Sequence, residues 1–159
     1  MKTMTTMEPK KKEADKRENG AQNSKEDQGV IRLPGGLLGF EKAKEYVLLG
    51  CPEEAPFLRL QMNDEPKLTF LAIEPSQAVE DYQPDLSDED TRFLALEKPE
   101  DAMLVNIVTL HRDGTATVNL KGPIVVNRRT LIGRQIIPLN SSEYSLQHAL
   151  VASSPKLCA

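Results

Sequence analysis

Residues 102–120 read AMLVNIVTLHRDGTATVNL, and this stretch decides the fold. Residues 102–110 form a long run rich in Val and Ile, a composition typical of a buried strand. In residues 115–120, three polar residues alternate with three apolar ones, as expected of a strand with one buried face. The link between the two runs ends in Asp113-Gly114, a dipeptide that readily adopts the positive backbone angles of a tight turn. The stretch therefore predicts a β-hairpin.

The remainder of the folded part consists of short apolar runs separated by dense turn signals. Six further strands are predicted, at Val30–Leu33, Tyr46–Leu49, Phe57–Met62, Leu68–Ile73, Pro123–Asn127 and Gln135–Leu139. Only one helix is predicted, with Ser87 as its N-terminal cap and Lys98-Pro99 at its end. Short strands, many turns and one small helix indicate an all-β fold, a small closed or partly open β-barrel with one short helix.

The chain of 159 residues divides by composition into a tail and a folded domain. Residues 1–29 contain three Met but no Val, Ile, Leu, Phe, Tyr or Trp, and 13 of them are charged. Such a segment cannot bury enough apolar surface to offset its conformational entropy, which predicts a disordered charged tail. The domain is expected at residues 30–152, followed by a flexible C-terminus at 153–159.

Composition also excludes several classes of protein. No apolar run approaches the roughly 18 residues that span a bilayer, and the charged start is not a signal peptide. The two cysteines, Cys51 and Cys158, are too few to staple a secreted scaffold. A soluble protein of a reducing cytoplasm is therefore expected, with no membrane partner.

The residues that carry catalysis or bind metals are few. His111 falls in the predicted hairpin turn and His148 near the C-terminus, and neither has the spacing of a zinc ligand set. The glycine cluster of residues 34–40 lacks the Gly-Lys-Ser/Thr of a phosphate loop and predicts a sharp chain reversal instead. No paired acid and base has credible spacing. We expect no enzyme activity, no metal and no cofactor.

Charge is distributed unevenly along the domain. Residues 74–101 hold ten carboxylates and two basic groups, a net charge of -8, whereas residues 121–134 contain four basic groups and no acid: Lys121, Arg128, Arg129 and Arg134. The acidic stretch is either a solvated surface or a face that attracts a basic protein. The basic patch leaves open an RNA-binding β-barrel, although residues 30–159 carry a net charge of -5, which disfavours direct nucleic-acid binding.

Several motifs together resemble the FliW family of flagellar assembly factors. Residues 33–41, LPGGLLGFE, are similar to the family stretch FP-x-G-[LI]-x-GFE. Further matching pieces follow in family order: Ala55–Phe57, Leu68–Pro75 with Tyr82, Ile107–Thr109, Thr117–Leu120, Pro123–Asn127, Gly133–Gln135, and Tyr144 with His148–Leu150. The resemblance covers about residues 30–150. It departs at the start, where the charged tail stands in place of the family's first strand.

The resemblance implies a small β-barrel regulator that is a monomer when free and binds two protein partners. One is flagellin, whose terminal segments are amphipathic helices. The other is CsrA, a small RNA-binding dimer that represses flagellin translation and that FliW-like proteins hold off the flagellin message. Because CsrA needs a basic surface for RNA, we expect the acidic face to bind it, through Glu74, Asp81, Tyr82 and Asp85.

Overall fold

The structure is a computed structural model that describes residues 29–64 and 67–150. Within these residues nine strands form one largely antiparallel sheet. The strands are β1 (Val30–Arg32), β2 (Glu45–Gly50), β3 (Phe57–Met62), β4 (Thr69–Ile73), β5 (Ala102–Leu110), β6 (Ala116–Val118), β7 (Ile124–Asn127), β8 (Gly133–Gln135) and β9 (His148–Ala149).

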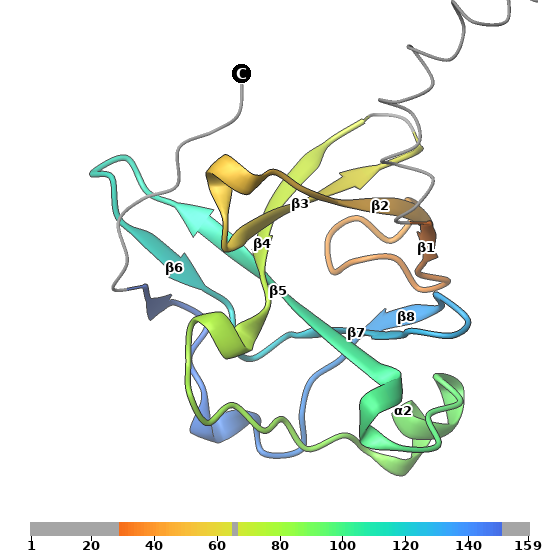
Figure 1. Cartoon of the computed structure of the whole chain (residues 1–159). Coiled ribbons are helices and arrows are strands. Elements are labelled where there is room, and N and C mark those ends of the chain that lie inside the picture. The colour runs from red at the N-terminus through yellow and green to blue at the C-terminus, as the bar shows by residue number, and fades with distance from the viewer. Residues whose placement is uncertain (1–28, 65–66, 151–159) are drawn as a thin grey trace, which may run out of the picture.

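The sheet curls into a partly open barrel (Figure 1). β1 to β6 pair in sequence order, and β9 adds to β6. β7 pairs with the first half of β5, from Ala102 to Val105, and with β8. On the far side, the Arg32 N–H donates to the Leu131 carbonyl at 2.9 Å, which brings the β7–β8 turn against β1. A single bridge, and not a full strand pair, therefore joins the two ends of the sheet.

The alternation of side chains along the strands creates two apolar layers. Inside the barrel, Tyr46, Leu60 and Val105 belong to a cluster that also contains the fully buried Leu33. On the opposite face of the sheet, Phe57 and Val118 belong to a second cluster. In β5, Ile107 packs against the first cluster and its neighbour Val108 belongs to the second. Successive side chains of a strand point to opposite faces, so a strand that is covered on both faces needs apolar residues at successive positions.

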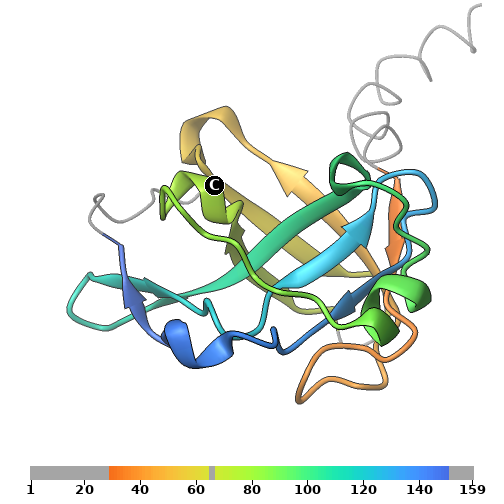
Figure 2. The ribbon, with the colours of Figure 1, turned by 90° about the horizontal axis from the view of Figure 1, so that it is seen from below.

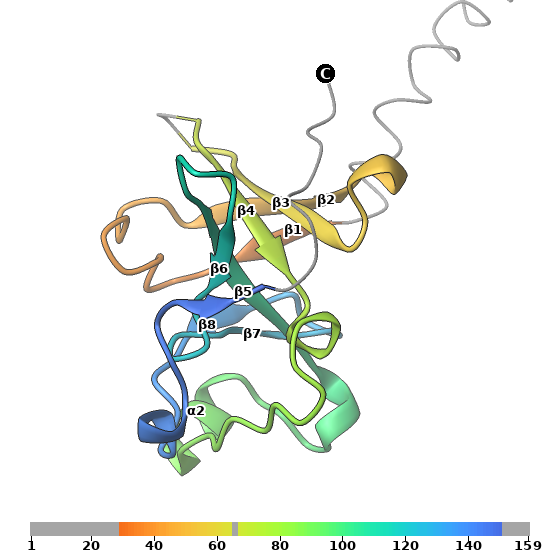
Figure 3. The ribbon, with the colours of Figure 1, turned by 90° about the vertical axis from the view of Figure 1, so that its left-hand side faces the viewer.

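The connection from β4 to β5 lies outside the barrel. It contains the 3-10 turns η3 (Pro75–Gln77) and η4 (Pro99–Asp101) and the one α-helix of the described residues, α2 (Asp88–Phe93). Figure 2 shows this connection running past β5 and β7 to α2. Figure 3 shows α2 on the side of β7 and β8 that faces away from β1 to β3. We call residues 74–101 the acidic crossover.

Most predicted elements are confirmed, within one or two residues at their ends. β5 has the predicted bounds, and Gly114 in the following turn has φ of 91°. The Ser87 hydroxyl accepts the Asp90 N–H at 3.1 Å, as expected of a helix cap. The all-β fold is also confirmed. The predicted tail, apart from Gly29, and the predicted C-terminus at 153–159 lie outside the described residues.

Two predictions of extent are wrong. The helix stops at Phe93 and does not reach Lys98, because Ala95 adopts φ of 54°, a left-handed conformation that ends an α-helix. The predicted strand at 135–139 is also wrong, since β8 ends at Gln135. Beyond that point Leu139 donates its N–H to the carbonyl of Asp85, so the chain leaves the sheet and lies along the acidic crossover.

Candidate functional site

The acidic crossover is fixed to the barrel at its start by Tyr82. The Tyr82 hydroxyl donates to the Leu120 carbonyl at 2.6 Å, and the buried Asn106 amide lies 3.4 Å from the same hydroxyl. The ring stacks edge-on with Tyr144, with centroids 4.7 Å apart. Burial raises the pKa of Tyr82 to about 12, so the hydroxyl is a neutral hydrogen-bond donor at neutral pH. Tyr82 therefore holds the crossover to β5 and to the segment that follows β6.

The middle of the crossover is fixed through the end of α2. Leu94 is buried against Val125 and Ile136. Asn127, which is fully buried at the end of β7, donates its amide to the Leu94 carbonyl at 2.8 Å and to the Ala95 carbonyl at 3.2 Å. These bonds satisfy carbonyls that the helix itself leaves without partners. The helix is thus held on the outer face of β7.

Two arginines of the predicted basic patch are engaged by the crossover. The Arg134 guanidinium lies 3.1 Å from the Asp90 carboxylate and stacks over the ring of Phe93, 4.2 Å from its centroid. Arg129 lies 3.5 Å from the buried Asp101 carboxylate. Opposite charges that are far apart in the sequence therefore pair in the fold, and they hold α2 and η4 against β7 and β8.

Asp101 is the most enclosed carboxylate of the crossover. Its burial opposes ionisation, but the N–H groups of Glu97 and Lys98 and the Arg129 guanidinium outweigh that effect and hold the pKa of Asp101 below its usual value. Asp101 therefore carries a negative charge at neutral pH, and this charge stabilises the turn before β5 through its bonds to Glu97, Lys98 and Arg129.

Within the part of the chain that the structure describes, the remaining carboxylates of the crossover are not neutralised by an internal ion pair. Among the described residues, eight of the ten form no ion pair, since only Asp90 and Asp101 do so. Asp81 and Asp85 are exposed, and Glu74 is half-buried at the start of η3. A carboxylate without an internal partner keeps its electrostatic attraction for an external cation. The outer surface of the crossover is thus strongly negative.

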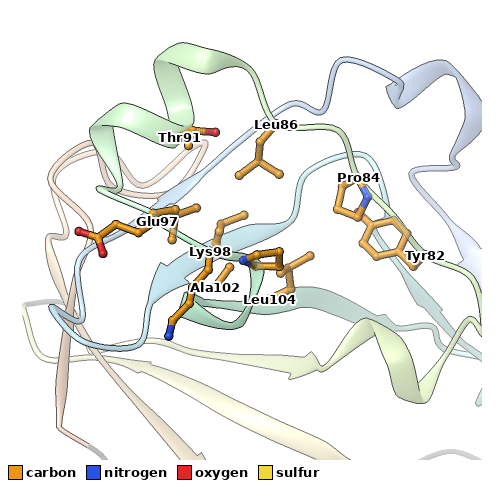
Figure 4. A pocket seen from close by; sticks show the side chains of 11 residues that line it. Tyr82, Pro84, Leu86, Thr91, Glu97, Lys98, Ala102 and Leu104 are labelled. Carbon is orange, nitrogen blue, oxygen red and sulfur yellow. The ribbon is translucent and has the colours of Figure 1, made fainter.

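A groove lies between the crossover and the sheet. Its apolar part has a volume of about 430 Å³ and is lined by side chains that include Leu86, Leu96 and Leu104. Figure 4 shows Glu97 and Lys98 at one end of this hollow and Tyr82 at the other. A second hollow of about 340 Å³ shares Tyr82 and Leu104 with the first. We call the two hollows together the crossover groove.

The second hollow brings predicted site residues of both signs together. Glu74 and Glu80 line it from the crossover, and Arg128 lines it from the end of β7. Tyr82 lies where the two hollows meet, whereas Lys121 lies in the connection between β6 and β7. The fold therefore gathers Glu74 and Tyr82 beside one of the four predicted basic residues.

Sequence reasoning missed the apolar part of the groove. The sequence places Leu96 near the predicted end of the helix and Ala102 and Leu104 in a strand. Only the fold brings these side chains opposite Leu86. One signal was available, since the strand that contains Ala102 and Leu104 is apolar on both faces and both faces must therefore be covered. The sequence of that strand does not tell which other segment covers its outer face.

The described residues offer no assembled metal centre and no membrane helix. No group of three or more His, Cys, Asp or Glu side chains in residues 29–64 and 67–150 is placed to hold an ion. None of the helices in that part of the chain has the length and apolar character needed to cross a bilayer. His111, one of the two histidines, has its Nε2 2.9 Å from the Thr117 hydroxyl within the β5–β6 hairpin.

Comparison with known proteins agrees with this architecture. The family model described as FliW protein matches residues 13–150, so the match begins inside the segment that composition marks as a tail. The flagellar assembly factor FliW of Natranaerobius thermophilus is 37% identical over 123 residues, which cover 76% of this chain and 81% of that protein. The flagellar assembly factor FliW of Desulfitobacterium hafniense (strain DSM 10664 / DCB-2) is 42% identical over 123 residues, covering 76% and 80% respectively.

A solved structure gives the same result in three dimensions. A crystal structure of the flagellar assembly factor FliW superposes with a TM-score of 0.69 at 34% sequence identity, covering 79% of this chain and 87% of that one. The resemblance seen in the sequence motifs is therefore confirmed by the family model, by the relatives and by the fold. This chain belongs to the FliW family of flagellar assembly factors.

Proposed function

We propose that this FliW-family protein binds flagellin and CsrA, and that it links the amount of flagellin to the translation of flagellin mRNA by holding CsrA off the message. The family to which the chain belongs supports this function, and the exposed negative surface of the acidic crossover supports binding of a basic partner. The protein acts in the cytoplasm, is a monomer when free, and forms and breaks no covalent bonds.

CsrA is proposed to bind the acidic crossover beside the crossover groove. An RNA-binding surface is basic, and eight carboxylates of the crossover have no internal ion pair among the described residues. The apolar part of the groove offers desolvated contact area next to those charges. Charged rims mainly accelerate association and select the partner, while the apolar floor stabilises the complex.

The same negative surface explains how RNA would be excluded. Once CsrA is bound, the carboxylates of residues 74–101 lie close to its RNA-binding surface, and phosphates approaching that surface meet like charge. RNA and this protein then compete for CsrA through charge repulsion as well as through overlap. By thermodynamic linkage, RNA bound to CsrA must weaken the affinity of CsrA for this protein by the same factor.

A charge-reversal series tests this proposal. We expect Glu74→Lys with Asp81→Lys to weaken CsrA binding by about tenfold at low salt and by less than about threefold at high salt, because mobile ions screen exposed charges. The neutral pair Glu74→Gln with Asp81→Asn is the matched control and should fall between wild type and the reversal. Affinities of all three proteins that are equal at both salt concentrations would exclude the electrostatic role.

The competing function is direct RNA binding through the basic patch. Arg129 and Arg134 are already paired with Asp101 and Asp90, which lowers the positive potential available to phosphate. A filter-binding assay of the purified protein with flagellin mRNA and no CsrA should show no retention. A pull-down from lysate of the native host should retain CsrA and flagellin, and retention of neither would contradict the proposed function.

A further inference from the structure

A second groove lies at the open mouth of the barrel, away from the acidic crossover. Its floor continues the interior face of the sheet through Phe70 of β4 and Ile107 and Thr109 of β5. Leu38, from the loop after β1, and Leu146, from the segment before β9, line its rim. The hollow has a volume of about 340 Å³. We call it the mouth groove.

The mouth groove exposes large apolar side chains. Leu38 is 64% exposed and Leu146 is 61% exposed, although both line a hollow that the buried core residue Leu37 also lines. Phe40 is 38% exposed and is held in place by an edge-on contact with Phe70, with ring centroids 5.2 Å apart. Apolar residues gathered around one hollow are typical of a binding surface, whereas single exposed leucines are not.

The loop that carries Leu38 is held in a defined position. Gly36 adopts φ of 68°, and a Cβ there would lie 2.5 Å from the backbone of Glu41, so this chain reversal requires glycine. The Leu38 N–H donates to the side chain of Gln135 at 2.9 Å, which ties the rim to β8. The groove is therefore built before a partner arrives, which reduces the entropy lost on binding.

The charge of the groove differs from that of the rest of the domain. None of the ten residues that line it is ionisable, and its polar members are Thr, Asn and Gln. Residues 30–159 as a whole carry a net charge of -5, and the crossover groove contains Glu74, Glu80 and Arg128. An uncharged groove with amide groups among its lining residues suits the apolar stripe of an amphipathic segment and disfavours a charged one.

The pairing of the floor strands favours a helical occupant. β4 is hydrogen-bonded to β3 and β5, and β5 is hydrogen-bonded to β4 and β6, so the floor strands have neighbours on both sides. An extended peptide would therefore find no strand edge at the floor, and the edge strands β8 and β9, which pair only with β7 and β6, border the groove only at its rim. An occupant that lies across the floor must satisfy its backbone groups within itself, which is the condition that an α-helix meets.

The chain's own N-terminal segment does not suit this groove. Residues 1–28 contain no Val, Ile, Leu, Phe, Tyr or Trp, and Met1, Met4 and Met7 are their only large apolar side chains among 13 charged residues, so they offer little apolar area to fill a cavity. We propose that the mouth groove binds an amphipathic α-helix of a partner protein, with that helix's apolar stripe between Leu38 and Leu146. This inference rests on the proposed function, in which the partner with amphipathic terminal helices is flagellin.

Single substitutions at the rim test the location. Leu38→Glu and Leu146→Glu each place a carboxylate in the groove, and because both side chains are more than half exposed, neither change should unfold the domain. We expect each to weaken binding of monomeric flagellin by at least about tenfold in titration calorimetry with the full chain, as for a central apolar contact. CsrA affinity should stay within about twofold of wild type, because neither residue lines the crossover groove.

Leu139→Glu is the matched control, since Leu139 is 67% exposed but does not line the mouth groove. It should leave flagellin affinity unchanged. If the wild type binds flagellin and both rim variants bind it equally well, the mouth groove is not the site. A wild-type dimer in sedimentation that Leu38→Glu dissociates would show that a second copy occupies the groove and would also overturn the inference. Failure of the wild type to bind flagellin or CsrA would instead contradict the proposed function.

Discussion

Asn127→Ala should cost more stability than any other exchange of a polar residue for alanine in the connection between the sheet and the acidic crossover. The Asn127 side chain is fully buried and takes part in four hydrogen bonds. It donates to the carbonyls of Leu94 and Ala95 at 2.8 and 3.2 Å, and it accepts the N–H groups of Arg129 and Thr130 at 2.8 and 3.3 Å. One side chain thus orders both the end of α2 and the β7–β8 turn.

The expected cost follows from these four bonds. A typical intramolecular hydrogen bond contributes about 1 kcal/mol net, and a buried group left without a partner costs about 1–3 kcal/mol. Arg129 and Thr130 are exposed, so water can replace their lost acceptor, whereas the Leu94 carbonyl belongs to a buried residue. We therefore expect a loss of about 3 kcal/mol in the free energy of unfolding, which corresponds to about 10 °C in Tm for a domain of this size.

Urea denaturation followed by circular dichroism measures this loss, with Asn140→Ala as the matched control. Asn140 also accepts one N–H, from Asp85 at 2.9 Å, and donates to one carbonyl, that of Gln83 at 3.1 Å. Both partner residues are exposed, so water can substitute and the cost should be below about 1 kcal/mol. The reasoning is refuted if Asn127→Ala costs less than about 1 kcal/mol, or if the two variants are equally destabilised.

Two further predictions concern stability. In Gly133→Ala, the new Cβ would lie 2.9 Å from a methyl carbon of Leu33, so thermal unfolding should show a loss of about 2 kcal/mol, whereas Gly35→Ala, with open space around it, should change stability by less than about 0.5 kcal/mol. Equal melting temperatures for the two variants would contradict this close approach. The raised pKa of Tyr82, about 12 against an ordinary value of 10.0, means that the unfolded chain loses the hydroxyl proton first as pH rises. Its contribution is therefore complete below pH 10 and is lost between pH 10 and about 12, so Tyr82→Phe should flatten the fall in unfolding free energy across that range; an unchanged slope would contradict the assignment.

The sequence allowed the local structure to be predicted more reliably than its extent. The β5–β6 hairpin and the Ser87 cap depend on neighbouring residues, and both were found because Asp-Gly turns and serine caps act within four residues. The helix end was missed because Ala95 gives no compositional sign of its positive φ. The supposed strand at 135–139 has suitable side chains, but the backbone of Leu139 bonds to Asp85, a contact between residues far apart in the sequence.

The candidate site was predictable in its charges and not in its shape. The negative charge of residues 74–101 can be counted from the sequence. Which carboxylates are neutralised cannot, because Arg129 pairs with Asp101, 28 residues away, and Arg134 pairs with Asp90, 44 residues away. Likewise, the chain reversal predicted for residues 34–40 does not show that Leu38 lines a groove, because the sequence of a loop does not tell which of its side chains face the barrel. Long-range contacts of this kind require the fold itself.

The branching of β5 bears on how two partners would communicate. Ala102 and Leu104 line the crossover groove, and Ile107 and Thr109 line the mouth groove, so a single strand contributes to both surfaces. At about 3.3 Å per residue the nearest of these side chains are only about 10 Å apart along the chain. A rotation of this strand would move both sets of side chains together, so β5 is a continuous physical connection between the two surfaces.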